Sequence, residues 1–467
     1  AYFTRLETRL AARGLRAPIT ITASNGGTVA LRTARERPIE TVLSGPASGV
    51  VAAARAAERT PHARLITLDM GGTSSDIALT RSGEPEYTTR TTVGGLPLVM
   101  PVVNVSAIGA GGGSVVWVDP QGVLKVGPRS AGASPGPVCY GRGGTEPTVT
   151  DCYLACGFID PDNFLGGRMR LDRAAAERAL LPVAARLGFD GADAAGRAAL
   201  AALRVATAVM ATELSKGLTQ RGEDAGTFTL MPFGGAGPTH ANLLAEEARL
   251  SAVLVPAAPS TFCALGAILA DVKRDFVRSL RIRLWPEDPA ATAKLHTALA
   301  DLSTEARAWV ATEAEALRGH SLSATTEMRY AGQSFELTVD WDAATLAKPT
   351  PDAVAELFHR AHEAIYGFRD TASAVEVTAL RVRVTGHVPP IDMPDAPERP
   401  PAVPAGTRRV LGPAGWEDWP VHHRAQLGRG ATVAGPAVIE QEDSTLILLR
   451  GWRAEVDLRG NLELRRA

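Results

Sequence analysis

An acid-tipped glycine turn constrains the fold of this chain more than any other feature. Residues 69–76 read Asp-Met-Gly-Gly-Thr-Ser-Ser-Asp and lie between the apolar segments 65–68 and 77–79. These segments predict the two strands of a hairpin, and the paired glycines allow a sharp turn in which consecutive amide groups converge on one anion. Two hydroxyl side chains add further donors. The residues of this turn that are predicted to bind phosphate are Gly71, Gly72, Thr73 and Ser74.

The two carboxylates of this turn are the predicted catalytic residues. Asp69 ends the first strand, and Asp76 begins the second. Because Mg²⁺ prefers oxygen ligands and keeps several of its waters, Asp69 is also the predicted metal ligand, directly or through water. Asp76 is predicted to hold a second water or to fix the turn. The alternative is an ordinary glycine hairpin with Asp69 as its turn acid, since the chain contains 46 glycines.

A second glycine-rich turn occupies residues 233–240, between a predicted strand at 228–231 and a predicted helix at 240–247. Small residues at a strand-to-helix turn let a flat ligand or a phosphate approach the backbone and the helix N-terminus. A phosphate hairpin followed by such a turn is the order of motifs in the actin-like (ribonuclease H-like) ATPase fold, which is an α/β fold. The residues of this second turn that are predicted to bind the cofactor are Gly234, Gly235, Ala236 and Gly237.

Two further loops are candidates for a functional site. The glycine-rich segment 109–114 has two open interpretations, a second anion-binding nest or a flexible loop. The segment 130–144 is also rich in glycine and proline, but it contains Val138, Cys139 and Tyr140. Those side chains favour an ordered loop near a site.

Several single residues have a structural interpretation beside a functional one. Thr150 or Asp151 is predicted to cap the helix that follows, and catalysis by Asp151 is the alternative. His240 is interpreted as a packing or cap-region histidine, with a phosphate or substrate donor as the alternative. His422 and His423 are predicted to lie on a solvated strand.

The four cysteines do not suggest a disulfide framework in a chain of 467 residues. Buried thiols are the expected state. Cys152 and Cys156 are spaced to share a helix face, so zinc ligation is the alternative for them, although no histidine cluster completes such a site. A nucleophilic role for Cys139 lacks a His or Asp partner nearby in the sequence.

The composition argues against some classes of partner. Lys and Arg number 49 against 50 Asp and Glu, so the formal net charge is -1. Nucleic-acid binders have a basic surplus, and polybasic membrane anchors need one too. No segment is apolar for the length of a bilayer span, and the stretch 198–210 fits a buried helix better. With no signal peptide visible, we expect a cytoplasmic protein without nucleic-acid or membrane partners.

The pattern of predicted elements divides the chain into four segments. Residues 1–277 alternate between strands and helices and are predicted to form the ATPase region, and residues 288–387 are predicted to form a smaller α+β region. Residues 388–406 contain seven prolines and are predicted to be a linker or an extended wrap. Residues 407–467 are predicted to be rich in β-strands.

The chain resembles the hydantoinase A / 5-oxoprolinase family, which includes N-methylhydantoinase A subunits, the corresponding acetone carboxylase subunit and the first half of eukaryotic 5-oxoprolinase. The match runs nearly end to end and in order. It is based on residues 39–47, 69–76, 108–114, 126–151, 233–240, 260–276, 435–440, 443–445 and 451–452.

The resemblance implies a subunit of an ATP-dependent hydrolase that opens cyclic amides of the hydantoin or 5-oxoproline type, with ATP and Mg²⁺ as cofactors. Transfer of the γ-phosphoryl group to the amide oxygen would create a leaving group, and water would then attack. The implied partners are a hydantoinase B-type subunit and the small cyclic amide. The alternatives are a kinase-like subunit of an ATP-dependent ketone carboxylase and a non-catalytic actin-like module.

The resemblance also assigns roles to the candidate segments. It implies that residues 69–76 contact phosphates and Mg²⁺, that residues 234–237 lie beside adenosine or ribose, and that residues 130–144 lie near the substrate or a subunit junction. Family members carry an earlier Asp-x-Gly-Gly-Thr hairpin, which the printed sequence does not include. We therefore expect a fragment, or a separate chain that supplies that hairpin. The isolated chain is expected to bind ATP weakly and to be inactive.

Overall fold

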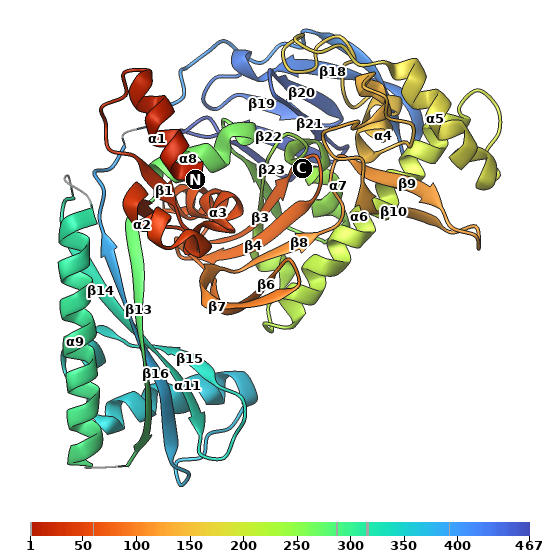
Figure 1. Cartoon of the computed structure of the whole chain (residues 1–467). Helices are drawn as coiled ribbons and strands as arrows, with labels where there is room; N and C mark the ends of the chain where they lie inside the picture. The colour runs from red at the N-terminus through yellow and green to blue at the C-terminus, as the bar shows by residue number, and fades with distance from the viewer. Residues whose placement is uncertain (1, 59, 286–287, 314–316, 392) are drawn as a thin grey trace. The chain divides into compact units, whose positions relative to one another are not determined.

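The computed structural model describes residues 2–58, 60–285, 288–313, 317–391 and 393–467. The chain forms two compact units, and each is discontinuous in sequence (Figure 1). The first unit comprises residues 1–44, 89–102 and 269–391, and the second comprises residues 45–88, 103–268 and 392–467. The units do not coincide with the segments predicted from the sequence. Residues 288–387 belong to the same unit as residues 1–44, and the predicted ATPase region 1–277 is divided between the two units.

A nine-stranded sheet forms the centre of the second unit. Strands β12, β11 and β3 run parallel at its middle, and β4 and β23 flank them in antiparallel orientation. Parallel strands that are covered on both faces are expected to be almost continuously apolar, and these three are largely buried. The order is β19 (Thr432–Ala434), β22 (Trp452–Val456), β23 (Leu462–Arg466), β12 (Ala252–Val255), β11 (Thr229–Phe233), β3 (Arg64–Met70), β4 (Ser75–Arg81) and β5 (Glu84–Pro85), with β8 (Val105–Ile108) beside β4.

Helices cover both faces of this sheet. Leu65 and Met231 lie on the face that packs against α3 and α8, whereas Ile66, Leu68 and Leu230 lie on the face that packs against α4, α6 and α7. This alternation follows from the two-residue period of a strand. The helices of this unit are α3 (Ser44–Ala57), α4 (Val149–Ala155), α5 (Arg173–Arg186), α6 (Ala194–Thr219), α7 (Gly237–Glu247) and α8 (Phe262–Leu269).

Helix α6 is the one helix in the described residues that is long and apolar enough to cross a membrane by length and composition. Core helices of other proteins pass the same test. Half of its most apolar window is buried, and it contacts α4, α5 and α7. The apolar stretch 198–210 therefore packs within the second unit, as its interpretation as a buried helix predicts.

Two smaller sheets complete the second unit. The four-stranded sheet has the order β17 (Gly406–Gly412), β18 (Gly415–His423), β20 (Ala437–Gln441) and β21 (Ser444–Leu448). Strand β21 contacts helix α7, which carries the second glycine turn at its start. The two-stranded sheet consists of β9 (Ser114–Val118) and β10 (Leu124–Ser130).

A six-stranded sheet forms the first unit, and helices pack against one of its faces. Helix α9 contacts β13 and β16, and α11 contacts β15 and β13. The sheet order is β1 (Thr20–Thr22), β2 (Thr28–Ala30), β13 (Val272–Leu284), β16 (Val375–Gly386), β14 (His320–Tyr330) and β15 (Leu337–Asp340). The helices are α1 (Tyr2–Ala12), α2 (Leu31–Glu36), α9 (Pro289–Glu313), α10 (Ala343–Ala347) and α11 (Pro351–Tyr366). A separate ribbon pairs β6 (Tyr87–Val93) with β7 (Leu96–Val103).

The structure corrects several local predictions. The N-cap of α4 is Thr148, not Thr150 or Asp151, and Asp151 is the third residue of the helix in a capping box. Helix α7 begins at Gly237 rather than at residue 240, with a proline in its first turn. His422, which pairs with Ile439 of β20, is buried rather than solvated.

Candidate functional site

The two glycine turns lie next to each other at one edge of the nine-stranded sheet (Figure 1). Strands β3 and β11 are parallel neighbours, and Phe233 stands opposite Asp69 in their register. Because both strands end at this edge, the turn at 71–74 and the turn at 234–237 start side by side. The Ala236 amide N–H donates to the Met70 carbonyl at 3.1 Å and ties the two turns together.

Gly234 makes this close approach possible. A Cβ atom there would lie 2.6 Å from Asp69 Oδ1 and 2.6 Å from the Met70 carbonyl oxygen. The residue also has a φ of 78°, in the left-handed region that favours glycine. Gly235, in contrast, has nothing within 4 Å of an added Cβ. In the second turn, Gly234 thus packs against Asp69, whereas Gly235 has free space beside it.

The turn after β3 presents free amide groups to the outside. In the described part of the chain, the N–H groups of Gly72, Thr73 and Ser74 have no hydrogen-bond acceptor. A Cβ at Gly71 or Gly72 would meet nothing within 4 Å, so the outer side of the turn is uncovered. Consecutive free amides beside open space suit an anion such as a phosphate group.

The loop 109–114 supports this turn from behind and is neither an anion nest nor a freely hanging loop. The Gly112 N–H donates to the Gly71 carbonyl at 3.0 Å, and the Gly113 N–H donates to the Gly72 carbonyl. The Gly111 N–H donates to Ser114 Oγ at 2.8 Å. The amides that an anion would need are therefore already used, which corrects the anion-nest interpretation.

Glycines are required in this supporting loop because the backbones touch. A Cβ at Gly113 would lie 2.3 Å from the Gly72 carbonyl oxygen, and a Cβ at Gly111 would lie 2.6 Å from the Ser74 nitrogen. The Gly71 and Gly72 carbonyls accept from the loop, and the Ser74 nitrogen also lies close to it. Neither interpretation of this segment holds, because its backbone is hydrogen-bonded to the turn that it supports.

Asp69 and Asp76 are cross-strand partners at the end of the β3–β4 hairpin. Burial raises the pKa of Asp69, and the hydrogen bond from the Cys263 thiol partly offsets this. Burial, and secondly the charge of Asp69, raises the pKa of Asp76 to about 6. Two partly desolvated carboxylates that repel each other provide oxygen ligands where a divalent cation would relieve the repulsion.

The carboxylate pair limits the kind of metal that fits. No group of three His, Cys, Asp or Glu side chains that could hold a metal ion occurs among the residues described. Mg²⁺ is usually bound through one or two carboxylates together with substrate phosphates and water, so Asp69 and Asp76 fit this ion. The zinc alternative for Cys152 and Cys156 is wrong, since both thiols are buried in the core without a cluster.

Cys263 is a site residue that sequence reasoning missed. Its Sγ donates to Asp69 Oδ2 at 3.4 Å. Burial, followed by the nearby Asp69 charge, raises the pKa of the thiol to about 12, so it stays protonated and can donate. The two residues are 194 positions apart, and nothing in the local sequence of Cys263 signals a carboxylate partner.

His240 is a buried packing histidine and does not reach the surface. Thr207 Oγ1 donates to the Leu203 carbonyl at 2.7 Å and so accepts from His240 Nε2 at 3.1 Å. This fixes the tautomer, and Nδ1 then accepts from the Tyr153 hydroxyl at 2.7 Å. Burial lowers the pKa of His240 to about 4, so the ring is neutral. It connects α4, α6 and α7 behind the second turn.

The Asp151 carboxylate is one of the groups that order the loop 130–144. Asp151 accepts from the Cys139 N–H at 2.8 Å and from the Val138 N–H at 3.2 Å, besides its contacts with the cap residue Thr148. Burial, and secondly the charge of Asp151, raises the pKa of Cys139 well above its usual range, so a nucleophilic role is disfavoured. Asp151 therefore joins the capping box of α4 to the loop 130–144.

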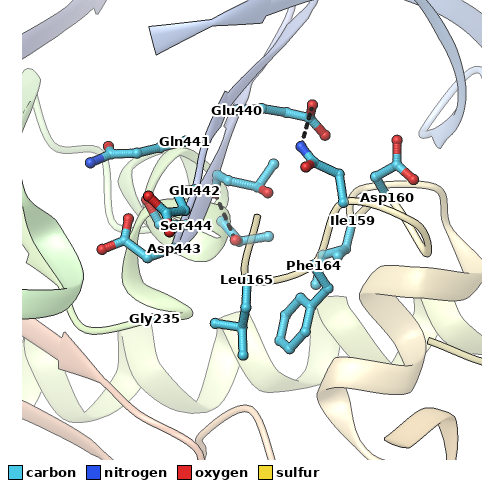
Figure 2. Close-up of a pocket in the computed structure, with 13 residues that line it drawn as sticks. Ile159, Asp160, Phe164, Leu165, Gly235, Glu440, Gln441, Glu442, Asp443 and Ser444 are labelled. Carbon is cyan, nitrogen blue, oxygen red and sulfur yellow. Dashed lines mark hydrogen bonds between the residues drawn. The ribbon is translucent and has the colours of Figure 1, made fainter. Parts of the chain in front are cut away.

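A small hollow borders the outer side of the second turn (Figure 2). It has a volume of about 30 Å³ and is lined by residues from α7, from the β20–β21 turn and from the loop after α4. In the view, Gly235 and Leu165 lie below the hollow and the segment 440–444 lies above it. Gly235 therefore faces a cavity, whereas Gly234 faces Asp69.

Comparison with known proteins places the chain in a family. Residues 1–276 match the hydantoinase/oxoprolinase family, and residues 286–467 match the hydantoinase/oxoprolinase C-terminal domain. The chain belongs to the hydantoinase/oxoprolinase family. It is 34% identical to the caprolactamase subunit alpha of Pseudomonas jessenii over 99% of this chain and 67% of that protein. It is 30% identical to the acetone carboxylase beta subunit of Xanthobacter autotrophicus over 95% of this chain and 63% of that protein.

Solved structures of family members agree with the fold. The crystal structure of ATP-dependent caprolactamase from Pseudomonas jessenii aligns with a TM-score of 0.86 at 34% identity, over 100% of this chain and 68% of that chain. Nucleotide-free acetone carboxylase aligns with a TM-score of 0.80 at 28% identity, over 100% of this chain and 67% of that chain. The prediction of an α/β, actin-like ATPase fold is confirmed. This member of the family spans about two thirds of the length of these relatives.

Proposed function

We propose that this chain is the nucleotide-binding subunit of an ATP-dependent hydrolase that opens a small cyclic amide. The observation that carries the proposal is the placement of an open amide turn, two carboxylates and a glycine strand-to-helix turn at one sheet edge. Relatives that share the whole length of the chain include an ATP-dependent caprolactamase, and a 5-oxoprolinase of Arabidopsis thaliana is 31% identical over 91% of the chain and 34% of that protein.

The turns would divide the nucleotide between them. The free amides of residues 72–74 and the hydroxyls of Thr73 and Ser74 would donate to phosphate oxygens. Residues 234–237 would lie against the adenosine, since Gly235 leaves its side of the turn open. The loop 130–144 would lie near the substrate or at a subunit junction.

Asp69 and Asp76 would hold Mg²⁺, through oxygen or through bound water. When bound, that ion would neutralise phosphate charge during transfer. The protein's own contribution is to hold the two carboxylates at fixed positions across the hairpin, and Gly234 leaves the space that Asp69 Oδ1 occupies.

The chemistry requires activation because an amide carbon is a poor electrophile. A new P–O bond would form to the amide oxygen while the bond from the γ-phosphorus to ADP breaks. Water would then add to the amide carbon and the C–N bond of the ring would open, which frees the amine and leaves an acyl phosphate. A second water would hydrolyse this acyl phosphate to a carboxylate and free phosphate. Positioning and charge neutralisation are the main demands of the first step, and both belong to this site.

The proposed assembly is a cytoplasmic hetero-oligomer. Relatives are named as subunits, which supports partner chains. The proposed partners are a hydantoinase B-type subunit, which would handle the hydrolytic half of the reaction, and a polypeptide that carries a first phosphate hairpin.

The test is an Asp69→Ala variant in the assembled enzyme, with ADP and ring-opened product measured for caprolactam, hydantoin and 5-oxoproline. We expect ADP formation to fall about 100-fold or more, because electrostatic stabilisation of the transferring group is lost. The control is Asp301→Ala, since the Asp301 side chain is 49% exposed and forms an ion pair with Arg278 in the first unit. Full ADP formation by Asp69→Ala would favour a non-catalytic actin-like module.

The second candidate is a kinase-like subunit of an ATP-dependent ketone carboxylase. The alignment with acetone carboxylase at a TM-score of 0.80 favours it. Incubation of the complex with ATP, acetone and ¹⁴C-bicarbonate separates the two candidates. Label fixed into an acid product identifies a carboxylase, whereas ring opening without bicarbonate identifies the amide hydrolase.

A further inference from the structure

One thiol of this chain differs from the other three. Cys139, Cys152 and Cys156 are buried in the main core, whereas Cys263 of α8 is half-buried against the cluster between α3 and the sheet and donates to Asp69 Oδ2 at 3.4 Å. We propose that Cys263 is a positioning residue, whose thiol orients the Asp69 carboxylate for the cation of the nucleotide site. This inference rests on the proposed function.

The geometry shows why Asp69 needs orientation. The rotation of an aspartate carboxylate about its Cβ–Cγ bond is broad, so a partner must select one orientation. Asp69 Oδ1 lies over the bare Cα of Gly234, and Oδ2 accepts the hydrogen bond from the thiol. With both oxygens located in this way, the remaining lone pairs of the carboxylate keep a defined direction for a ligand.

The thiol is itself held in place by close packing of α8 on α3. A Cβ at Gly49 of α3 would lie 3.0 Å from Cys263 Sγ and 2.4 Å from the Phe233 ring. A Cβ at Gly266 of α8 would lie 1.8 Å from the Ser48 carbonyl oxygen. Two helix glycines therefore allow a contact that fixes the sulfur relative to β11 and β3.

The hydrogen-bond donor of Cys263, rather than the volume of its side chain, orients Asp69. A hydroxyl can make the same hydrogen bond as the thiol, whereas valine fills a similar space without a donor. Cys263→Ser should therefore preserve the orientation of Asp69, and Cys263→Val should release it. Cys156→Ala is the matched control, since it removes a buried helix thiol that lies away from the hairpin.

Two measurements test the inference in the assembled enzyme that contains the full-length chain. The first is Mn²⁺ binding in the presence of ATP, followed by electron paramagnetic resonance. The second is the Mg²⁺ concentration that gives half-maximal ADP formation, with kcat determined separately. Loss of a hydrogen bond to a metal-ligating carboxylate commonly weakens metal affinity about 10- to 100-fold.

We expect Cys263→Val to weaken Mn²⁺ binding at least about tenfold. The Mg²⁺ concentration that gives half-maximal ADP formation should rise by the same factor. The thermal unfolding temperature of Cys263→Val should be no lower than that of Cys156→Ala. Cys263→Ser should retain the affinity of the natural chain. Unchanged Mn²⁺ and Mg²⁺ dependence in Cys263→Val, with the natural chain active, would overturn the inference and leave the proposed function intact. A natural complex that neither binds Mn²⁺ with ATP nor releases ADP would overturn both.

Discussion

Asp69 Oδ1 occupies space beside Gly234 that no other residue would leave free, because a Cβ at position 234 would lie 2.6 Å from that oxygen. The two residues are far apart in sequence, yet the parallel pairing of β3 and β11 places them together. In the second glycine turn, Gly234 therefore leaves room for the Asp69 carboxylate at the start of the first turn.

Gly234→Ala is expected to lower ADP formation about 100-fold, because displacement of a catalytic group by about 1 Å can have this effect. The left-handed backbone adds a cost of about 1–2 kcal/mol in the free energy of unfolding. The control is Gly188→Ala, which has a φ of 72° and nothing within 4 Å of the added Cβ. It should lose similar stability and keep its turnover. Equal turnover in the two variants, measured by ADP release, would contradict the role of the contact.

Gly113→Ala tests the supporting loop. The added Cβ would lie 2.3 Å from the Gly72 carbonyl oxygen, so either the loop or the phosphate turn must move. We expect a loss of about 1–3 kcal/mol in the free energy of unfolding, together with weaker ATP binding in isothermal titration of the complex. Gly45→Ala, in α3, is the comparison, since an added Cβ there meets nothing within 4 Å. ATP affinity that is unchanged in Gly113→Ala would show that the turn does not depend on this loop.

The stability of the protein should depend on Asp76 between pH 3.8 and pH 6. The folded-state pKa of Asp76 is about 6, above the ordinary value of 3.8, so the favourable contribution of the protonated acid is lost as the pH rises through this range. Asp76→Asn cannot ionise, so its free energy of unfolding should not fall as the pH rises through this range. We expect the variant to be more stable than the natural chain by roughly 1–3 kcal/mol above pH 6, with the difference vanishing toward pH 3.8. Urea denaturation across this range measures it, and a difference independent of pH would contradict the cause.

His240 should give the opposite pH dependence. Its folded-state pKa is about 4, below the ordinary value of 6.5, because burial disfavours the charged ring. The stability from the neutral histidine is complete above pH 6.5 and is lost as the pH falls toward 4.

The natural chain should therefore lose roughly 3 kcal/mol over that interval through this residue, and His240→Gln should not. The variant is expected to be less stable at pH 7 by about 1–3 kcal/mol, since Tyr153 and Thr207 lose their partner. Parallel pH profiles of the two proteins in chemical denaturation would show that the ring is not the cause.

Local patterns account for what the sequence analysis predicted correctly. The hairpin at Asp69–Asp76 follows from two apolar segments around paired glycines, and helix α11 follows from a proline start and a helical apolar period. Helix α4 shows the limit of this approach. A hydroxyl residue beside an acid predicts a cap, but only the fold shows that Thr148 provides it while Asp151 also ties the loop 130–144.

The remaining errors concern residues whose role depends on distant neighbours. The segment 109–114 has the composition of an anion nest, but its amides are used by the carbonyls of the turn that it supports. His422 stands beside a second histidine near the end of β18, yet its side chain is buried in the folded chain. The role of the segment 109–114 and the burial of His422 both depend on residues that are distant in the sequence.

The sequence by itself determined the family, the class of fold and the two glycine turns, because hydrophobic period and turn chemistry act over a few residues. The tertiary structure alone decided that β3 lies beside β11, that the loop 109–114 supports the turn at residues 71–74 and that Cys263 contacts Asp69. Those contacts join residues that are far apart in sequence, and they depend on how whole strands and helices pack, which no short window of residues specifies.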